Sequence, residues 1–437
     1  MLTSALPALR RTPAAAQREH EEGGGAEWMA EHDMSMERLL AAVEQAPPVD
    51  SVPVVAALVA EQLQARDVCF LITDIGGDTV WRLPAVPGDW TGRQDPEPLA
   101  GTVYDEVVRS QQLRVTGAVA HGGDAVGASR VIAPVTSRGD AIGVLELFMP
   151  DPPSAVEKKY IAQAAHALAY VVTANRRFTD LYEWCRRSET PTLAAEIQQN
   201  LLPNALTVEA GQATVAGALE PATQVAGDTF DFSLDENTLH VSVSDAMGHS
   251  EDAALLATLL IGALRQTRRA RATLADQAHA AHLALVEHGR DATATGVLLR
   301  VDLTTGRAQM VNAGHPWPLR LRHGRVHEVE PEVDLPFGAP WSGDYQVQEL
   351  DLEPGDRLLL YTDGMTERNT PTLDLSTLLE RDTHLHPREV VRFLTRALRE
   401  ATGGHIIDDA SVVCVDWHGP GSSRRTSRSG ADTRSGR

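Results

Sequence analysis

The chain has 437 residues, of which 43% are hydrophobic, and it carries a formal net charge of −21. This length predicts two or three domains, and the hydrophobic content is sufficient for ordinary soluble cores. The acidic balance argues against binding to nucleic acid or an anionic membrane, because phosphate groups would repel the chain. Any phosphorylated substrate must therefore be met by cations. Three cysteines without metal-type or paired spacing fit a reducing, cytoplasmic location.

Both ends of the chain have compositions that predict little packed structure. Residues 1–35 are rich in Ala, Glu, Gly and Pro, and their arginines follow the weakly apolar start, which is the wrong order for a signal peptide. We expect a disordered segment over residues 1–47 and a disordered tail over residues 419–437, which are mostly Ser, Gly and Arg. The longest apolar stretch, from Ala253 to Leu264, is too short to span a bilayer, so no membrane segment is predicted.

Residues 48–155 alternate predicted helices and strands. Helices are predicted over 54–63 and 103–109, and strands over 68–72, 80–83, 114–119, 131–134 and 141–148. This order resembles a GAF sensor domain of α/β type, with Ile142-Gly143-Val144-Leu145-Glu146-Leu147 as its closing strand. The resemblance implies either a binding site for an unknown small molecule or a dimerisation module. Cys69 lies in a predicted core strand, which indicates a buried structural thiol.

A helical linker is predicted over residues 156–203. Its seam residues recur at alternating spacings of three and four: Ile161, Ala164, Leu168, Val171, Asn175, Phe178, Tyr182 and Cys185. Such a heptad pattern predicts a coiled coil that would form a homodimer, and it equally suits a helix packed on its own sensor domain. Pro191 interrupts the helix, and a second helical face follows at Leu193, Ile197 and Leu201.

Residues 225–249 predict a β-hairpin, because two alternating apolar runs flank a short polar stretch. If Glu236 and Asn237 form the turn, antiparallel pairing places Asp228 opposite Asp245. Opposed Cβ atoms in such a pair lie about 5 Å apart. Two carboxylates at that distance repel each other unless one is neutralised or a cation lies between them, and Gly227 beside Asp228 leaves room for an ion, so the hairpin indicates a metal site. The alternative is that both Asp residues only cap strand ends.

Three further polar signatures lie at the ends of apolar runs: Asn312-Ala313-Gly314-His315, Tyr361-Thr362-Asp363-Gly364 and Asp408-Asp409-Ala410-Ser411. In this order, together with the hairpin, they resemble the SpoIIE/RsbU branch of the PPM metal-dependent serine/threonine phosphatases, over about residues 190–417. Residues 195–203 look like the helix that leads into the phosphatase domain of that family. Ala226, Ala246 and Ser250 depart from the family pattern by small substitutions.

The resemblance implies an α+β fold with an αββα sandwich over residues 204–418, which long antiparallel strands and flanking helix pairs also favour. It implies that Asp228 and Asp245 hold two Mn²⁺ or Mg²⁺ ions, with the Ala246 carbonyl, Asp363 and Asp408 as further ligands. Oxygen ligands of this kind suit those ions, whereas a zinc site would need clustered His and Cys. Water shared by the two ions would be the nucleophile, without a phosphoenzyme.

Other polar residues near these motifs have different expected roles. Asp231 lies three residues from Asp228 on a strand and should point to the opposite face, which indicates a structural role. Asp409 should point away from Asp408 by the same alternation, and the strand register decides which of the two binds metal. His249 and His315 are expected to act in turns or packing rather than as general acids, and Asn312 is a further candidate site residue whose role the sequence leaves open.

Two classes of function follow from these motifs. The first is a protein phosphatase that acts on a phosphoserine or phosphothreonine of a regulatory protein, which in this family is typically an anti-anti-sigma factor. In this class the sensor domain regulates turnover through the helical linker. The second is a catalytically inactive scaffold that binds regulatory partners. The presence of all four Asp positions favours the phosphatase.

Overall fold

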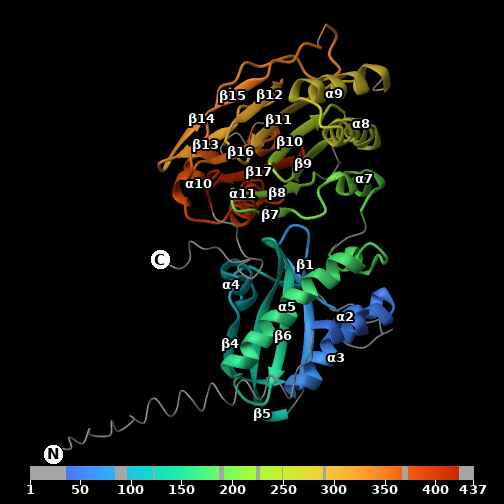
Figure 1. Ribbon diagram of the computed structural model, residues 1–437, viewed down its shortest axis with the longest axis vertical. Coiled ribbons are helices and arrows are strands. Elements are labelled where there is room, and N and C mark those ends of the chain that lie inside the picture. Colours follow the sequence, from blue (N-terminus) through green and yellow to red (C-terminus); the bar gives the residue numbers. More distant parts are fainter. Residues whose placement is uncertain are drawn as a thin grey trace, which may run out of the picture.

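The structure is a computed structural model that describes residues 36–83, 96–121, 124–186, 191–222, 227–248, 250–288, 292–341, 343–366 and 373–422. Figure 1 shows two domains, one above the other, with the N-terminal domain in blue to green and the C-terminal domain in green to red. The N-terminal domain ends with the helices that follow its sheet. The C-terminal domain begins with the helix after Pro191.

The N-terminal domain is built on one antiparallel sheet of six strands in the order β3-β2-β1-β6-β5-β4. The strands are β1 (Asp67–Thr73), β2 (Thr79–Arg82), β3 (Glu97–Pro98), β4 (Arg114–His121), β5 (Asp124–Ser137) and β6 (Asp140–Met149). The helices are α2 (Met36–Gln45), the 3-10 turn η1 (Pro48–Asp50), α3 (Ser51–Leu63), α4 (Val103–Ser110), α5 (Ala155–Asn175) and α6 (Leu181–Cys185).

Alternation along β1 explains how helices cover both faces of this sheet. Val68, Phe70 and Ile72 pack in one core with residues of α2, α3 and α5. Cys69 and Leu71 point to the other face, where they pack with residues of α4. Because successive side chains of a strand point to opposite faces, a strand this apolar must be covered on both sides. Cys69 is buried, as predicted.

The prediction of disorder over residues 1–47 is wrong from Met36 onward, where α2 begins. Leu39 and Val43 lie four residues apart on this helix, and both are buried in the core that includes residues of α3. That spacing places them on one helical face, so the segment is ordered by packing that its local composition does not reveal. Residues 1–35 lie outside the described residues, as do residues 423–437 of the predicted tail.

The predicted heptad seam is part of the N-terminal core. Its buried members on α5 and α6 are Ile161, Ala164, Leu168, Val171, Tyr182 and Cys185. The helix ends at Asn175, whose side-chain amide donates to the Val171 carbonyl at 3.0 Å, and Phe178 beyond it is 70% exposed. The structure therefore shows the alternative arrangement, with the helix packed on its own domain in place of a continuous coiled coil.

The C-terminal domain contains two antiparallel sheets. The strands of the first, in the order β15-β12-β11-β10-β9, are β9 (Asp228–Leu234), β10 (Thr238–Ala246), β11 (Ala294–Asp302), β12 (Ala308–Ala313) and β15 (Gln348–Leu350). Those of the second, in the order β14-β13-β16-β17-β8-β7, are β7 (Thr207–Glu209), β8 (Ala213–Glu220), β13 (Leu319–Arg322), β14 (Arg325–Glu328), β16 (Arg357–Tyr361) and β17 (Ala410–Trp417). The helices are α7 (Leu193–Leu201), α8 (Ser250–Arg269), α9 (Leu274–His288), the 3-10 turn η2 (Asp363–Met365), α10 (Leu375–Arg381) and α11 (Pro387–Ala401).

These elements form the predicted αββα sandwich. One core lies between the sheets and contains Phe230, Val243 and Val413. A second core joins α8 and α9 to the outer face of the first sheet, and a third joins α10 and α11 to the outer face of the second. Each sheet therefore buries both faces, which is why its central strands carry nearly continuous apolar runs.

The long apolar stretch on α8 is explained by this sandwich. Leu260, Ile261 and Leu264 are buried against α9 and the first sheet. None of the helices in the described part of the chain combines the length and apolar character needed to cross a membrane.

Helix α7 packs beside α8 with a face that matches the predicted one in part, because Ile197 and Leu201 pack against buried core residues. Leu193 is 65% exposed, whereas Ala194 and Gln198 are buried. Ala194 contacts Ala254 of α8. The prediction used the spacing of large apolar residues, so it did not include the buried Ala194 and Gln198.

Candidate active site

The β9–β10 hairpin brings the two predicted acidic residues together. Asp245 pairs with Asp228 in the strand register, and the turn at Glu236 and Asn237 is closed by the Asp235 amide, which donates to the Thr238 carbonyl at 2.8 Å. Both Asp residues share the strand parity of Phe230 and Val243, which point into the core between the sheets. The predicted register is confirmed, and the carboxylates lie at the end of the inter-sheet core.

Gly227 permits the close approach of the two strand ends. A Cβ atom at this position would lie 2.3 Å from the Ala246 carbonyl oxygen, which is too close for any side chain. The Ala246 amide donates to the Gly227 carbonyl at 3.3 Å. The Ala246 carbonyl therefore lies directly beside the backbone of Asp228.

Asp228 is surrounded mainly by other carboxylates. It is 2% exposed, and its Oδ2 atom accepts a hydrogen bond from the Thr362 hydroxyl at 2.6 Å. Burial raises the pKa of Asp228 well above its usual range, and the nearby Asp245 and Asp409 raise it further, against hydrogen bonds from Thr362 and Ser411. A carboxylate in this setting is stabilised in its charged form by a bound cation.

The other two acidic loops meet at the ends of β16 and β17. The Thr362 amide donates to the Ser411 carbonyl at 3.1 Å, and the Ser411 amide donates to the Thr362 hydroxyl at 2.9 Å. A Cβ atom on Gly364 would lie 1.8 Å from the Asp409 carbonyl oxygen, so only glycine fits there. Asp363 and Asp408 lie in these adjoining loops and are both half-buried.

The adjacent residues Asp408 and Asp409 are held differently. Asp409 is 1% exposed; its Oδ1 atom accepts the Ala222 amide at 2.7 Å, and its Oδ2 atom accepts the side-chain amide of Gln198. The Asp408 carboxylate accepts a 3.1 Å hydrogen bond from the Asp409 amide, and Asp408 is half-buried. Both Asp409 oxygens thus accept hydrogen bonds from distant parts of the chain, and Asp408 is the more exposed of the two residues.

Gln198 is a site residue that the sequence reasoning missed. Its side-chain amide, which is buried, donates to the Asp228 carbonyl at 2.9 Å as well as to Asp409. It therefore connects α7 to the start of β9 and to the loop that precedes β17. The only signal in the sequence was a glutamine four residues after Ala194, at the spacing of one helical face.

Residues 235–418 match the sequence model of the family described as Stage II sporulation protein E (SpoIIE). The C-terminal domain is a SpoIIE-type domain. The matched range contains Asp245, Asp363 and Asp408 and begins seven residues after Asp228.

Curated relatives and solved structures resemble this domain. The chain is 26% identical to phosphoserine phosphatase RsbP of Bacillus subtilis over 236 residues, which cover 51% of this chain and 57% of RsbP. It is 24% identical to phosphoserine phosphatase RsbU of Bacillus subtilis, with 51% and 68% covered. The crystal structure of the RsbU and RsbW domains of Rv1364c from Mycobacterium tuberculosis has 26% identity, covers 49% of this chain and 63% of that one, and gives a TM-score of 0.45.

Asp231 of the SpoIIE-type domain points away from the acidic cluster, as strand alternation predicts. Its carboxylate forms ion pairs with Arg265 at 2.9 Å and Arg268 at 2.8 Å, both on α8. These contacts fasten α8 to the outer face of β9. Asp231 therefore has a structural role.

The candidate residues Asn312 and His315 bond mainly to each other and to strand β11. The Asn312 side chain accepts the His315 amide at 2.8 Å and donates to its carbonyl at 2.9 Å, while His315 Nδ1 lies 2.9 Å from the Thr295 hydroxyl. Burial lowers the pKa of His315 to about 3, against the effect of a hydrogen bond from the imidazole to the Tyr361 backbone. A neutral, buried imidazole fits a packing role. His249 lies outside the described residues.

The donor set of the SpoIIE-type domain fits hard divalent cations. Asp228, Asp245, Asp363, Asp408 and the Ala246 carbonyl offer only oxygen atoms, which Mg²⁺ and Mn²⁺ prefer. Among the described residues, no three Asp, Glu, His or Cys side chains lie close enough together to enclose an ion by themselves. Water and substrate oxygens would complete the shells, which is how Mg²⁺ is usually held.

Proposed function

We propose that this protein is a metal-dependent protein serine/threonine phosphatase. The observation that carries the proposal is the pairing of Asp228 with Asp245 at the end of the inter-sheet core, with Asp409 behind them and no cationic side chain among the hydrogen-bond partners identified for Asp228 in the described structure. A fold seldom buries such repulsion without a function for it. The curated relatives RsbP and RsbU, which are named phosphoserine phosphatases, support the same assignment.

In this proposal each site residue has a distinct task. Asp228 and Asp245 would hold two Mn²⁺ or Mg²⁺ ions, the Ala246 carbonyl would add a backbone ligand, and Asp363 and Asp408 would supply further oxygen ligands to one ion. Asp409 and Gln198 position the strands that carry the ligands, since both Asp409 oxygens already accept hydrogen bonds. When bound, the ions supply Lewis-acid activation of water and neutralise phosphate charge.

The proposed substrate is a phosphoserine or phosphothreonine on a regulatory protein, of the anti-anti-sigma factor type. The family resemblance and the names of the curated relatives support this class. The net charge of −21 means that bound cations must attract the phosphate group. A comparison of phosphoproteins in cells with and without this protein would identify the substrate by its increased phosphorylation in the deletion strain.

The N-terminal domain is proposed to be a GAF-like sensor that takes a small molecule and regulates the phosphatase in the cytoplasm. The six-stranded antiparallel sheet and the order of its elements support this part of the proposal. A homodimer would have to use a surface other than the predicted seam, because most seam residues are buried in the core of one chain.

The alternative function is an inactive scaffold that binds regulatory partners through the same fold. Release of phosphate from p-nitrophenyl phosphate by the full chain, with Mn²⁺, Mg²⁺, Zn²⁺ or EDTA, separates the two. We expect turnover with Mn²⁺ or Mg²⁺ and none with EDTA. An absence of turnover with every ion would favour the scaffold, and metal-independent turnover would refute the metal assignment.

A further inference from the structure

Helix α11 of the SpoIIE-type domain faces the N-terminal domain with a stripe of arginines, here called the arginine face: Arg388, Arg392, Arg396 and Arg399. Their spacings of four, four and three residues place them along one side of the helix. Figure 1 shows α11 and β7 at the edge of the C-terminal domain that lies against the N-terminal domain. Arg388 is only 5% exposed, because it donates to the Gly139 carbonyl at 2.5 Å and to the Val108 carbonyl at 3.2 Å.

The turn between β1 and β2 contacts the rest of the arginine face. Arg392 donates to the Gly77 carbonyl, Arg399 forms an ion pair with Asp78, and Arg396 lies 3.7 Å from the same carboxylate. A guanidinium group with several donors suits backbone carbonyls and carboxylates at a turn. Two separate turns of the N-terminal domain are thus bound by one helix.

The turn between β5 and β6 also reaches the edge strand β7. The Glu209 amide donates to the Arg138 carbonyl at 2.9 Å, so the N-terminal domain covers an edge that would otherwise expose its backbone. The Glu209 carboxylate lies 2.6 Å from His386, which caps α11, and both side chains are buried. The contact therefore includes backbone and side-chain interactions and is not limited to exposed charges.

Glycines in both turns allow this close contact. A Cβ atom on Gly77, at φ +71°, would lie 2.2 Å from Arg392 Nε, and one on Gly139, at φ +85°, would lie 2.5 Å from Glu209 Cγ. Gly101 of the same domain has φ +73° with nothing within 4 Å of the corresponding position. Backbone conformation alone explains Gly101, whereas a Cβ atom at Gly77 or Gly139 would also displace the Arg392 or Glu209 side chain of the neighbouring domain.

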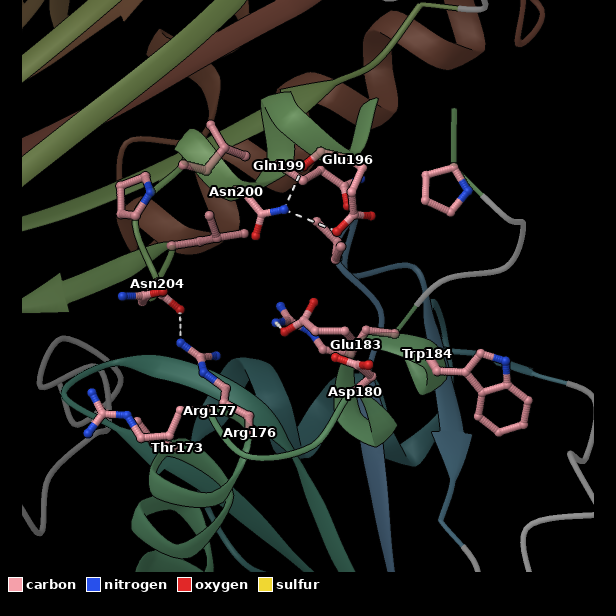
Figure 2. A pocket seen from close by; sticks show the side chains of 16 residues that line it. Thr173, Arg176, Arg177, Asp180, Glu183, Trp184, Glu196, Gln199, Asn200 and Asn204 are labelled. Carbon is pink, nitrogen blue, oxygen red and sulfur yellow. Dashed lines mark hydrogen bonds and ion pairs between the residues drawn. The ribbon is translucent and has the colours of Figure 1, made fainter. Parts of the chain in front are cut away.

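The contact leads directly to the acidic site. Arg399 lies 3.4 Å from Glu220 at the end of β8, and two residues later the Ala222 amide donates to Asp409 at 2.7 Å. On the side of α7 the domains are separated by a cleft of about 730 Å³. Figure 2 shows Arg176 donating across this cleft to the Asn204 carbonyl. The close packing at the α11 contact thus contrasts with the open cleft on the other side.

We propose that docking of the N-terminal domain on the arginine face of α11 holds Glu220 and Ala222 in place, and thereby strengthens metal binding at the acidic site. The metal part of this inference rests on the proposed function, and the docking part does not. A coupling of this kind must be reciprocal, so metal binding also tightens docking.

The test uses the full chain with Gly77→Ala or Gly139→Ala, and Gly101→Ala as the control with a similar backbone conformation but no contact. Hydrogen exchange read by mass spectrometry should become faster in the peptides that contain Glu209 and the start of α11, because the added methyl group displaces the Arg392 or Glu209 side chain from its contact between the domains. Calorimetric titration with Mn²⁺ should show a dissociation constant raised about fivefold or more. Gly101→Ala should change neither measurement.

Arg392→Ala is a second variant that removes the contact without backbone strain, and the exposed Arg325→Ala is its control. Exchange rates equal to those of the controls would refute docking. Faster exchange with an unchanged Mn²⁺ dissociation constant would refute the coupling. If the unmodified chain binds no Mn²⁺, the proposed function and the coupling both fail, while the exchange data still decide whether the domains dock.

Discussion

Each domain buries a carboxylate in its sheet, but the charges around the two differ in sign. Positive side chains surround Glu146, whereas other carboxylates lie beside Asp228. Glu146 on β6 accepts hydrogen bonds from Arg82 at 2.6 Å, Arg130 at 2.6 Å and Tyr104 at 3.0 Å. Burial raises the pKa of Glu146, but these partners outweigh it and hold the pKa below its usual range. Asp228 is buried beside Asp245 and Asp409, and its pKa is raised.

This difference separates a structural carboxylate from the one that we propose as a metal ligand. The N-terminal domain supplies two arginines for one Glu146, so its charge is compensated by the chain itself. The C-terminal domain places like charges together, and such repulsion is relieved either by protonation of one carboxylate or by a bound cation. Burial alone therefore says little about function, and the sign of the neighbouring charges says more.

The largest expected effect is on turnover. Asp245→Ala should lower metal-stimulated hydrolysis of p-nitrophenyl phosphate at least about 100-fold, because it deletes a ligand of both ions. In EDTA its stability to urea should hold or rise, since carboxylate repulsion is relieved. Glu236→Ala, at the exposed turn of the same hairpin, is the control and should keep its activity. Retention of most activity in Asp245→Ala would remove Asp245 from the metal site.

Glu146→Gln should have the largest effect on stability. It leaves Arg82 and Arg130 without a counter-charge, and breaking such a buried network costs about 3 to 5 kcal/mol. Both arginine side chains are 23% exposed, so we expect about 2 to 4 kcal/mol after allowing for solvent screening. Urea unfolding of the N-terminal domain measures this loss. If Asp228→Asn lowered the free energy of unfolding as much as Glu146→Gln does, the proposed difference between the two buried carboxylates would be contradicted.

Metal addition should stabilise only the C-terminal site. Mn²⁺ at a hundredfold excess over its dissociation constant should raise the stability of the folded chain by about 2.7 kcal/mol. Calorimetry with and without Mn²⁺ should show this shift in the unmodified protein and in Glu146→Gln, but not in Asp245→Ala. Equal shifts in all three would mean that the ion binds elsewhere.

The smallest expected effect concerns the hydrogen bond that each carboxylate accepts from a hydroxyl group. Tyr104→Phe removes a 3.0 Å hydrogen bond to Glu146 and should cost about 1 kcal/mol without changing Mn²⁺ binding. Thr362→Val removes a 2.6 Å hydrogen bond to Asp228, and its effect should include weaker Mn²⁺ binding. Urea unfolding and Mn²⁺ titration of both variants test the distinction. It would be lost if Tyr104→Phe weakened Mn²⁺ binding as much as Thr362→Val does.

Local patterns in the sequence determined the pairing of Asp228 with Asp245. Strand alternation and a two-residue turn fix which residues face each other within one hairpin, so no information from the rest of the chain is needed. The same holds for the opposite orientation of Asp231. The acidic residues at the other strand ends were found because each adjoins an apolar run, and the αββα architecture followed from the order of these elements.

Tertiary structure decided which residues support that pair. The Gln198 side chain binds Asp409, which is 211 positions away, and Thr362 binds Asp228 across 134 positions. Tertiary structure also decided that the apolar seam on α5 packs on its own domain. An apolar stripe predicts that a helix face is buried, but it does not predict which surface buries it. Contacts between distant elements depend on how these elements pack in three dimensions. Neither apolar periodicity nor turn residues predict that packing.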